Sequence, residues 1–327
     1  MTIGTNYLGL SLKSPIIVGS CGLADSVEDL QKMEEAGAGA VILKSIFEEQ
    51  IIYDIKRSVN VMAPTDNYGM SYDYIASHVA ADSLDRHFAL IAEAKRRLSI
   101  PVIGSINCYS FENWMTYTGK FQEAGCDALE LNMAILPYET SLSSDDVERL
   151  FGNIIQTLKR SISIPISIKV GTYFTDMAKF MQQLSWMGIN GITLFNKSLN
   201  VDIDIDAEKL TTASFLSSPQ ELYNTLRWVA ILKDKVRCDL SASTGIYTAD
   251  DVVKALLAGA QSVQVVSTLY KNGIDSLRQL NDGLRQWMDK KGYQSIDDFR
   301  GKLAVKSGDD ASMMLRTQFM KYFAEIN

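Results

Sequence analysis

One local pattern occurs four times in this chain: a helical segment ends at a glycine, and a short apolar strand follows at once. The four segments are EEAGAGAVILKS, QEAGCDALELN, SWMGINGITLFN and LLAGAQSVQVVS. Glycine accepts the positive φ that often closes a helix, so Gly37, Gly125, Gly188 and Gly259 are expected to be helix C-caps. The pattern predicts four joints at which a helix passes into a strand of an alternating α/β fold.

Four more apolar runs lie between these joints, at residues 14–20, 100–107, 164–170 and 236–243. They are rich in β-branched residues and almost continuously apolar, as are parallel strands that helices cover on both faces. Helical patterns such as DDVERLFGNIIQTLKRS separate them. Eight strands alternating with helices predict a TIM (β/α)8 barrel with a parallel eight-stranded core, which we expect to be a single domain over residues 1–327.

Charge and cysteine content exclude several classes of function. The net charge is −7 and no block of Lys and Arg occurs, which argues against nucleic-acid binding. The four cysteines form no CxxC pair, so we expect no metal site, and they fit a reducing cytoplasm. No signal-type start or apolar run of about 20 residues is present, so we expect no membrane association. His78 and His87 are expected on solvent-facing helix positions rather than in catalysis.

Polar residues end the predicted strands, at the edge where TIM barrels build their sites. These residues are Ser20 and Cys21, Lys44 and Ser45, Asn107 and Cys108, Asn132, Lys169, Asn196 and Lys197, Ser243 to Gly245, and Val266 and Ser267. The asparagines fit the start of a loop equally well. Lys44 and Lys169 are more informative, because a lysine directly after an apolar strand holds its ammonium near the barrel axis, where an anion or a polarised ring is the usual partner.

The segments after the last two strands predict a phosphate site. SASTGIYTADD supplies small residues and a helix start, and VQVVSTLY supplies Ser267 and Thr268. In TIM barrels these two loops often hold a phosphate with backbone N–H groups and a helix N-terminus. The same residue types are also common in turns that bind nothing.

The segments VILKS, ELN, SIKV, LFN and STGI, together with the tail KKGYQSIDDFRGKL, resemble the dihydroorotate dehydrogenase family over nearly the whole chain. That family comprises FMN-containing TIM barrels of pyrimidine metabolism, and the chain is similar to its soluble members. The resemblance implies a flavin-dependent dehydrogenase that acts on CH–CH groups. Hydride would pass between a small, dihydropyrimidine-like ring and flavin N5. We also expect a homodimer.

Carried over by residue, the resemblance implies that Lys44 and Asn132 act in catalysis and that Lys169 faces the N1/O2 edge of the flavin. A positive charge there stabilises the anionic reduced ring. Asn67, Asn132 and Asn196 would bind substrate. The expected FMN-binding residues are Gly19, Ser20, Lys44, Ser45, Asn107, Asn132, Lys169, Phe195, Thr244, Gly245, Val266 and Ser267.

One segment departs from the family pattern. Family members follow ELN with a Cys or Ser just before a proline, and that residue is the catalytic base. This chain reads ELNMAILP, with Ile135 and Leu136 in that place, and neither side chain accepts a proton. Candidates for a replacement base are Cys108, Cys21, Ser141, Ser143 and Ser144. The segment TDNYGMSYDY at residues 65–74 matches the family's substrate-binding loop only loosely. The substrate pocket is therefore expected to differ from that of the family.

Two other hypotheses remain open from sequence. In the first, the chain is an FMN-binding barrel without dehydrogenase activity that serves as a redox partner or a regulatory protein. In the second, it is a barrel for a different phosphorylated ligand and binds no flavin. Retention of both Lys44 and Lys169 argues against a pure binding role, since binding needs the phosphate site more than charges that tune a flavin.

Overall fold

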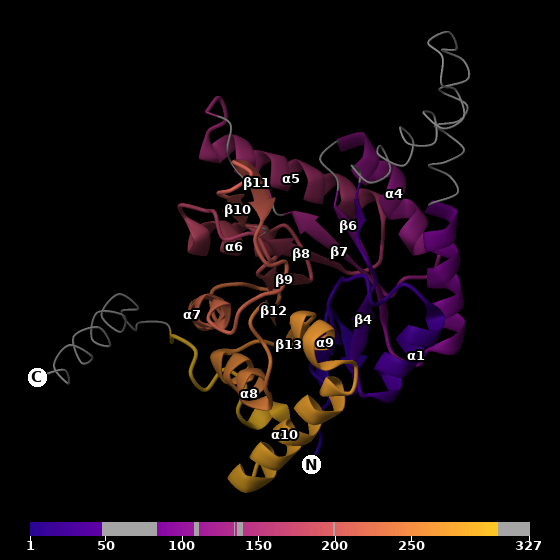
Figure 1. Cartoon of the computed structure of the whole chain (residues 1–327), viewed down its shortest axis with the longest axis vertical. Helices are drawn as coiled ribbons and strands as arrows, with labels where there is room; N and C mark the ends of the chain where they lie inside the picture. Colours follow the sequence, from indigo (N-terminus) through magenta and orange to yellow (C-terminus); the bar gives the residue numbers. More distant parts are fainter. Residues whose placement is uncertain (48–83, 108–110, 134, 136–139, 199, 307–327) are drawn as a thin grey trace, which may run out of the picture.

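A computed structural model describes residues 1–47, 84–107, 111–133, 135, 140–198 and 200–306. Eight parallel strands form a closed barrel (Figure 1). They are β3 (Ile16–Val18), β4 (Ala40–Ile42), β6 (Val102–Asn107), β7 (Ala128–Met133), β8 (Ile166–Val170), β9 (Gly191–Leu194), β12 (Asp239–Ser243) and β13 (Ser262–Val265). Each strand pairs with the next in this order, and β13 pairs with β3 to close the ring. The predicted TIM barrel is confirmed. A short strand, β5 (Ile46–Phe47), also pairs with β6.

Helices surround the barrel (Figure 1). They are α1 (Val27–Glu35), residues 84–97, α4 (Phe111–Glu123), α5 (Ser144–Ser161), α6 (Met177–Trp186), α7 (Glu221–Leu232), α8 (Ala249–Ala258), α9 (Ser267–Asn272) and α10 (Ser276–Lys291), followed by the 3-10 helix η1 (Ile296–Asp298). Among the described residues, no helix is long and apolar enough to cross a bilayer.

The four predicted helix-to-strand joints are present. Gly37, Gly125, Gly188 and Gly259 all have positive φ, between 83° and 120°. At the other helix ends, the hydroxyls of Ser26, Ser143 and Thr248 accept hydrogen bonds from the N–H three residues on. These caps satisfy backbone N–H groups that a helix cannot satisfy internally.

An antiparallel hairpin of β1 (Thr5–Tyr7) and β2 (Leu10–Leu12) belongs to a separate apolar cluster inside the barrel. Its Tyr7 and Leu8 are each 1% exposed and pack with residues of the early strands, among them Ile17 and Ile103. Gly191 at the start of β9 makes room for the hairpin, since a Cβ there would lie 2.5 Å from Leu8 Cδ2. The hairpin thus fills the barrel at the strands' amino ends, opposite the edge where a site is expected.

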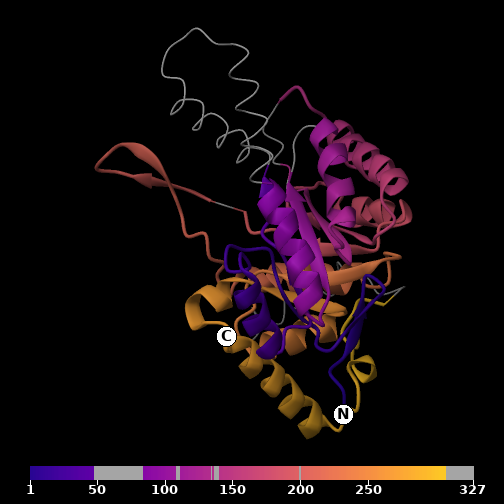
Figure 2. The same ribbon diagram turned by 90° about the vertical axis from the view of Figure 1, so that its right-hand side faces the viewer.

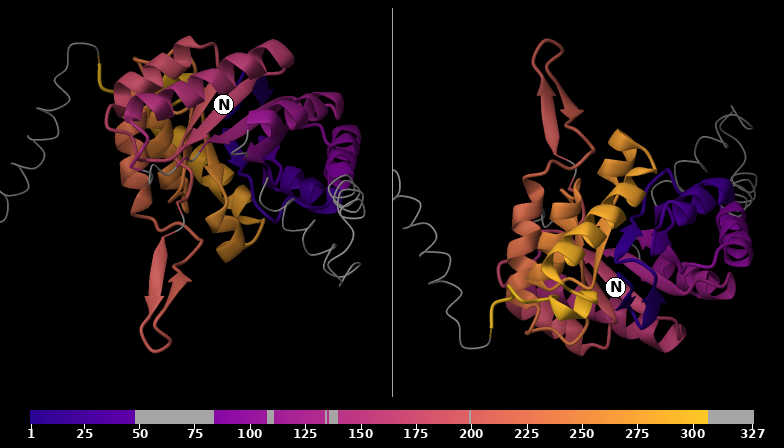
Figure 3. Two further views of the ribbon diagram at one scale, coloured as in Figure 1. Left: turned by 90° about the horizontal axis from the view of Figure 1, so that it is seen from above. Right: turned by 90° about the horizontal axis from the view of Figure 1, so that it is seen from below.

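A second hairpin, β10 (Val201–Asp204) and β11 (Lys209–Thr212), extends away from the barrel (Figures 2 and 3). This hairpin was not expected from the sequence. Its cross-strand pairing places Ile203 opposite Leu210, and both side chains are exposed, at 61% and 77%.

Candidate active site

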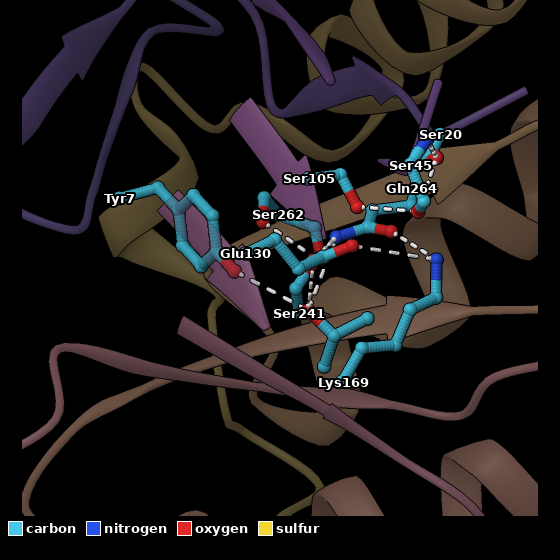
Figure 4. Close-up of polar contacts among 10 residues, drawn as sticks. Tyr7, Ser20, Ser45, Ser105, Glu130, Lys169, Ser241, Ser262 and Gln264 are labelled. Atoms are coloured by element: carbon cyan, nitrogen blue, oxygen red, sulfur yellow. Dashed lines mark hydrogen bonds and ion pairs between the residues drawn. The ribbon is translucent and has the colours of Figure 1, made fainter. Parts of the chain in front are cut away.

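The barrel interior becomes polar toward the carboxyl ends of the strands. Because side chains alternate along a strand, every second residue of each strand points inward. The buried polar side chains on these strands are Ser105, Glu130, Asn132, Ser167, Lys169, Thr193, Ser241, Ser243, Ser262 and Gln264. Figure 4 shows part of this set converging from five strands. The interior is polar at this end of the barrel and apolar at the opposite end, and this difference determines where the site lies.

Lys169 is the cation at the centre of this polar layer. Its side chain is 8% exposed, and its Nζ donates to Gln264 Oε1 at 2.9 Å (Figure 4). The same Nζ lies 3.6 Å from Glu130 Oε1. Register explains the convergence, since Lys169 on β8 pairs with Asn132 on β7, two residues beyond Glu130. The ammonium of Lys169 is therefore buried among side chains of other barrel strands.

Glu130 has no solvent exposure, and two neutral donors bind its other oxygen. Thr193 Oγ1 and Gln264 Nε2 donate to Oε2 at 2.9 and 2.6 Å. Below them, the Tyr7 hydroxyl lies 3.4 Å from Thr193 Oγ1. Burial raises the pKa of Tyr7 well above its usual value, and the charge of Glu130 adds to the effect. Tyr7 is therefore a neutral hydroxyl in this layer.

A cavity of about 340 Å³ opens above Lys169 and Gln264. Its wall includes Ser20, Cys21, Phe47, Asn196, Lys197, Phe215, Ser217, Ser243, Thr244, Gly245, Ile246, Val266, Ser267 and Tyr270. This volume suits a ligand of mononucleotide size. Of the expected FMN-binding residues, the cavity brings together Ser20, Lys169, Thr244, Gly245, Val266 and Ser267.

The segments after β12 and β13 meet at one side of this cavity. Thr244 and Gly245 both have positive φ, 73° and 72°. A Cβ at Gly245 would lie 2.5 Å from the backbone N of Leu222, so the position requires glycine. Ser217 Oγ accepts from the Gly245 N–H at 3.1 Å and donates to Ser267 Oγ at 3.0 Å, which ties the two segments together.

These features suit the binding of a flavin. A buried ammonium at the cavity floor suits the electron-rich edge of the ring. Asn132 is 8% exposed and its Oδ1 is buried without a hydrogen-bond partner in the described part of the chain, as expected of a group that awaits a ligand. At the far side, the first turn of α9 starts at Ser267, where helix N–H groups have no internal acceptor.

Hydroxyls link three neighbouring strand ends beside the cavity. Ser45 Oγ lies 3.0 Å from Ser20 Oγ and 2.7 Å from Ser105 Oγ, and the Ser45 N–H donates to Ser20 Oγ at 2.9 Å (Figure 4). Ser20 and Ser45 were expected from sequence, and Ser105 was not. The chain of hydroxyls fixes the rim formed by β3, β4 and β6.

Other predicted site residues lie elsewhere. Lys44 is exposed after β4 and does not line the cavity. Asn107 is half-buried at the end of β6, and Gly19 and Phe195 are buried at strand ends. Asn67, Cys108 and Leu136 lie outside the described residues.

The candidate bases are also dispersed. Ser141 is exposed, Ser143 caps α5 and Ser144 is the exposed first residue of that helix. Ile135 is half-buried and packs against the main core. Cys21 lines the cavity, but burial raises the pKa of its thiol. A raised pKa keeps the thiol protonated and makes it a poor base.

His87 is not solvent-facing, which corrects the sequence-based prediction. Its Nε2 is buried without a hydrogen-bond partner among the described residues, and its ring packs edge-on to Phe88 and Phe121. Burial, with a smaller contribution from the charge of Lys44, lowers the pKa of His87 to about 4. The helical pattern placed the residue correctly on a helix but on the wrong face. His78 lies outside the described residues.

Sequence reasoning did not assign Glu130, Thr193 or Gln264 to the site. A polar residue inside an apolar strand run was the available signal for all three. Lys197 was named as a strand end but was given no role. Lys197 lines the cavity and pairs with Glu221 Oε1 at 3.1 Å. Among the described residues, no group of three or more His, Cys, Asp or Glu side chains is arranged to hold a metal.

Comparison with known proteins gives a consistent result. The model of the dihydroorotate dehydrogenase family matches residues 2–288. The chain is 28% identical to the dihydroorotate dehydrogenase B (NAD(+)) catalytic subunit of Thermoplasma acidophilum, over 91% of this chain and 98% of that protein. It is 24% identical to a putative dihydroorotate dehydrogenase A (fumarate) of Aeropyrum pernix, over 91% and 96%. It is 25% identical to the dihydroorotate dehydrogenase (fumarate) of Lachancea kluyveri, over 92% and 98%.

Proposed function

This chain belongs to the dihydroorotate dehydrogenase family, and we propose on that basis that it is an FMN-dependent oxidoreductase for a small, dihydropyrimidine-like ring. Membership makes it an oxidoreductase that uses a flavin and acts on CH–CH groups. The relatives reported above are dehydrogenases by name, which favours an enzyme over a binding-only barrel.

The observation that carries the choice of FMN is the combination of a buried ammonium with a small-residue rim in one cavity. Lys169 lies at the floor, and the segments at Thr244–Gly245 and Val266–Ser267 form the side. The bound flavin supplies the hydride acceptor at N5. In this assignment the backbone N–H groups of the rim hold its phosphate, and Lys169 faces the ring edge that becomes negative on reduction.

Further roles follow from the family resemblance. We assign Asn132 and Asn196 to hydrogen bonds with substrate or flavin, and Gly19, Ser20, Ser45, Asn107 and Phe195 to the lining of the ring. The free, buried Oδ1 of Asn132 supports its role. Lys44 would act beside the substrate, and Asn67 would bind it.

Substrate preference is expected to differ from that of the named relatives. The half-buried, aliphatic Ile135 occupies the region where the family keeps its base. Proton removal without a positioned base typically loses about 10²–10⁴-fold in rate. We therefore expect dihydroorotate to be oxidised slowly or not at all, and another small ring to be the better substrate.

Two measurements test this function. The purified protein should be yellow and should release FMN, rather than FAD, on denaturation. Anaerobic addition of a panel of dihydropyrimidines should then bleach the flavin with at least one member, and dihydroorotate should bleach it slowly. Colourless protein that FMN does not reconstitute would overturn the cofactor assignment. Dihydroorotate turnover at ordinary enzymatic rates, about 1 to 10³ per second, would overturn the substrate assignment.

We also propose a cytoplasmic homodimer. The exposed apolar face of the β10–β11 hairpin supports the dimer, because a two-stranded hairpin is only marginally stable by itself. A second copy packed on this face would bury it.

A further inference from the structure

Glu130 is a fully buried carboxylate that the proposed reaction does not use. It lies on β7 inside the barrel and has no solvent exposure. Its Oε2 accepts two hydrogen bonds from neutral groups, while its Oε1 has no hydrogen-bond partner in the described part of the chain. Burying a carboxylate is costly unless a cation compensates it.

Lys169 is the only described residue that forms an ion pair with this carboxylate. The 3.6 Å between Nζ and Oε1 is longer than a hydrogen bond but short enough for a strong charge interaction in a buried site. Both side chains are almost inaccessible, at 8% and 0%, so water does little to screen them. The field that Lys169 presents to the cavity is therefore that of a cation with an anion close behind it.

Gln264 fixes this geometry. Its Oε1 accepts from Lys169 Nζ at 2.9 Å, and its Nε2 donates to Glu130 Oε2 at 2.6 Å (Figure 4). Because Lys169 only donates and the carboxylate only accepts, one orientation of the amide satisfies both. Thr193 supports the carboxylate from β9 at 2.9 Å. Side chains from β9 and β13 thus hold the pair, which itself spans β7 and β8.

We propose that Glu130 is a positioning residue that holds Lys169 through Gln264 and partly neutralises its charge, and so lowers the reduction potential of the flavin. The inference rests on the proposed flavin function. A positive charge beside the ring favours the more negative, reduced state, and a negative charge one layer below opposes that effect. Glu130 and Lys169 together therefore set the potential, with opposite signs.

A charge cycle on flavin-loaded protein tests the proposal by measuring the midpoint potential of four forms. Lys169→Met should lower the potential, because only the carboxylate remains. Glu130→Gln should raise it, because only the ammonium remains. The double variant should lie between the two single variants. Each single shift should correspond to at least a tenfold change in the ratio of reduced to oxidised flavin, which is about 30 mV for a two-electron couple.

Ser262→Ala is the matched control. Ser262 lies on β13, two residues before Gln264, has no exposure, and donates to Ser241 Oγ at 2.9 Å. Its removal disturbs a buried polar pair in the same barrel without changing the charge. The ratio of reduced to oxidised flavin should therefore stay within threefold of the wild-type value. Shifts of the same sign in Glu130→Gln and Lys169→Met, or a Glu130→Gln shift no larger than this control, would overturn the proposal.

Denaturant unfolding of the flavin-free protein gives a second readout. Each single variant leaves one buried charge uncompensated and should unfold at lower denaturant than the double variant. If Glu130→Gln does not fold, comparing Lys169→Met with the double variant still measures the effect of the carboxylate, and the double should have the higher potential. Wild-type protein that binds no flavin would refute the proposed function instead. A double variant that unfolds at the same denaturant concentration as the single variants, or at a lower one, would refute the pairing of Glu130 with Lys169.

Discussion

Ile135 lies in the sequence segment where the family resemblance places the catalytic base. It is half-buried against the core, where an aliphatic side chain accepts no proton and excludes water that would otherwise substitute. We predict that Ile135→Cys raises the rate at which dihydroorotate reduces the flavin, by up to about 10²-fold, and adds an ionisation to the pH profile. Stopped-flow bleaching measures this rate. Ile135→Val, which has no thiol, is the control and should give no increase; an equal increase in both variants would contradict the prediction.

His87 makes the stability of the protein depend on pH. The pKa of His87 is 6.5 in the unfolded chain, whereas burial lowers the pKa of the ring in the folded protein to about 4. The neutral ring therefore contributes stability above pH 6.5, and that contribution is lost as the pH falls from 6.5 toward 4. The loss amounts to about 3 kcal/mol at most, at about 1.4 kcal/mol per unit of pKa.

His87→Phe keeps the ring packing against Phe88 and Phe121 and removes the titration. Urea unfolding between pH 4 and 7.5 should show a shallower loss of stability in the variant than in the wild type. Identical slopes would show that the ring does not titrate as described.

At the scale of elements, helix α5 begins with a capping box. Ser143 Oγ accepts from the Asp146 N–H, and Asp146 Oδ2 accepts from the Ser143 N–H at 2.8 Å. We predict that Ser143→Ala destabilises the protein by about 1 kcal/mol while leaving turnover unchanged. Unfolding curves and steady-state rates measure the two effects. Ser141→Ala is the control, since its exposed hydroxyl caps no helix, and should change neither. Loss of turnover in Ser143→Ala with unchanged stability would instead support Ser143 as a base.

At the scale of the whole molecule, the β10–β11 hairpin gives the proposed dimer a testable surface. Ile203 and Leu210 lie opposite each other on one face, while Thr211 points to the other. We predict that Ile203→Asp converts a dimer into a monomer in light-scattering measurements, because it buries an unpaired charge in the interface. Thr211→Asp introduces the same charge on the opposite face and should leave the dimer intact. Wild-type protein that is monomeric would dismiss the dimer altogether.

The sequence by itself determined the alternating fold and much of the cavity wall. Gly37, Gly125, Gly188 and Gly259 marked the joints because the φ that closes a helix is a local requirement. Strand ends such as Lys169 and Thr244–Gly245 were predictable because parallel strands all end at one edge of a barrel. The prediction that Ile135 replaces the base came from the sequence, because a departure from a motif is a local feature.

Only the tertiary structure decided which polar side chains face one another inside the ring. Glu130, Thr193 and Gln264 come from strands up to 134 residues apart, and their contacts depend on barrel closure and register, which no local pattern encodes. His87 lay on a predicted helix, yet its burial depends on Phe121 of a neighbouring helix. The charge on Lys169 was therefore predictable from sequence, but the carboxylate that moderates it was not.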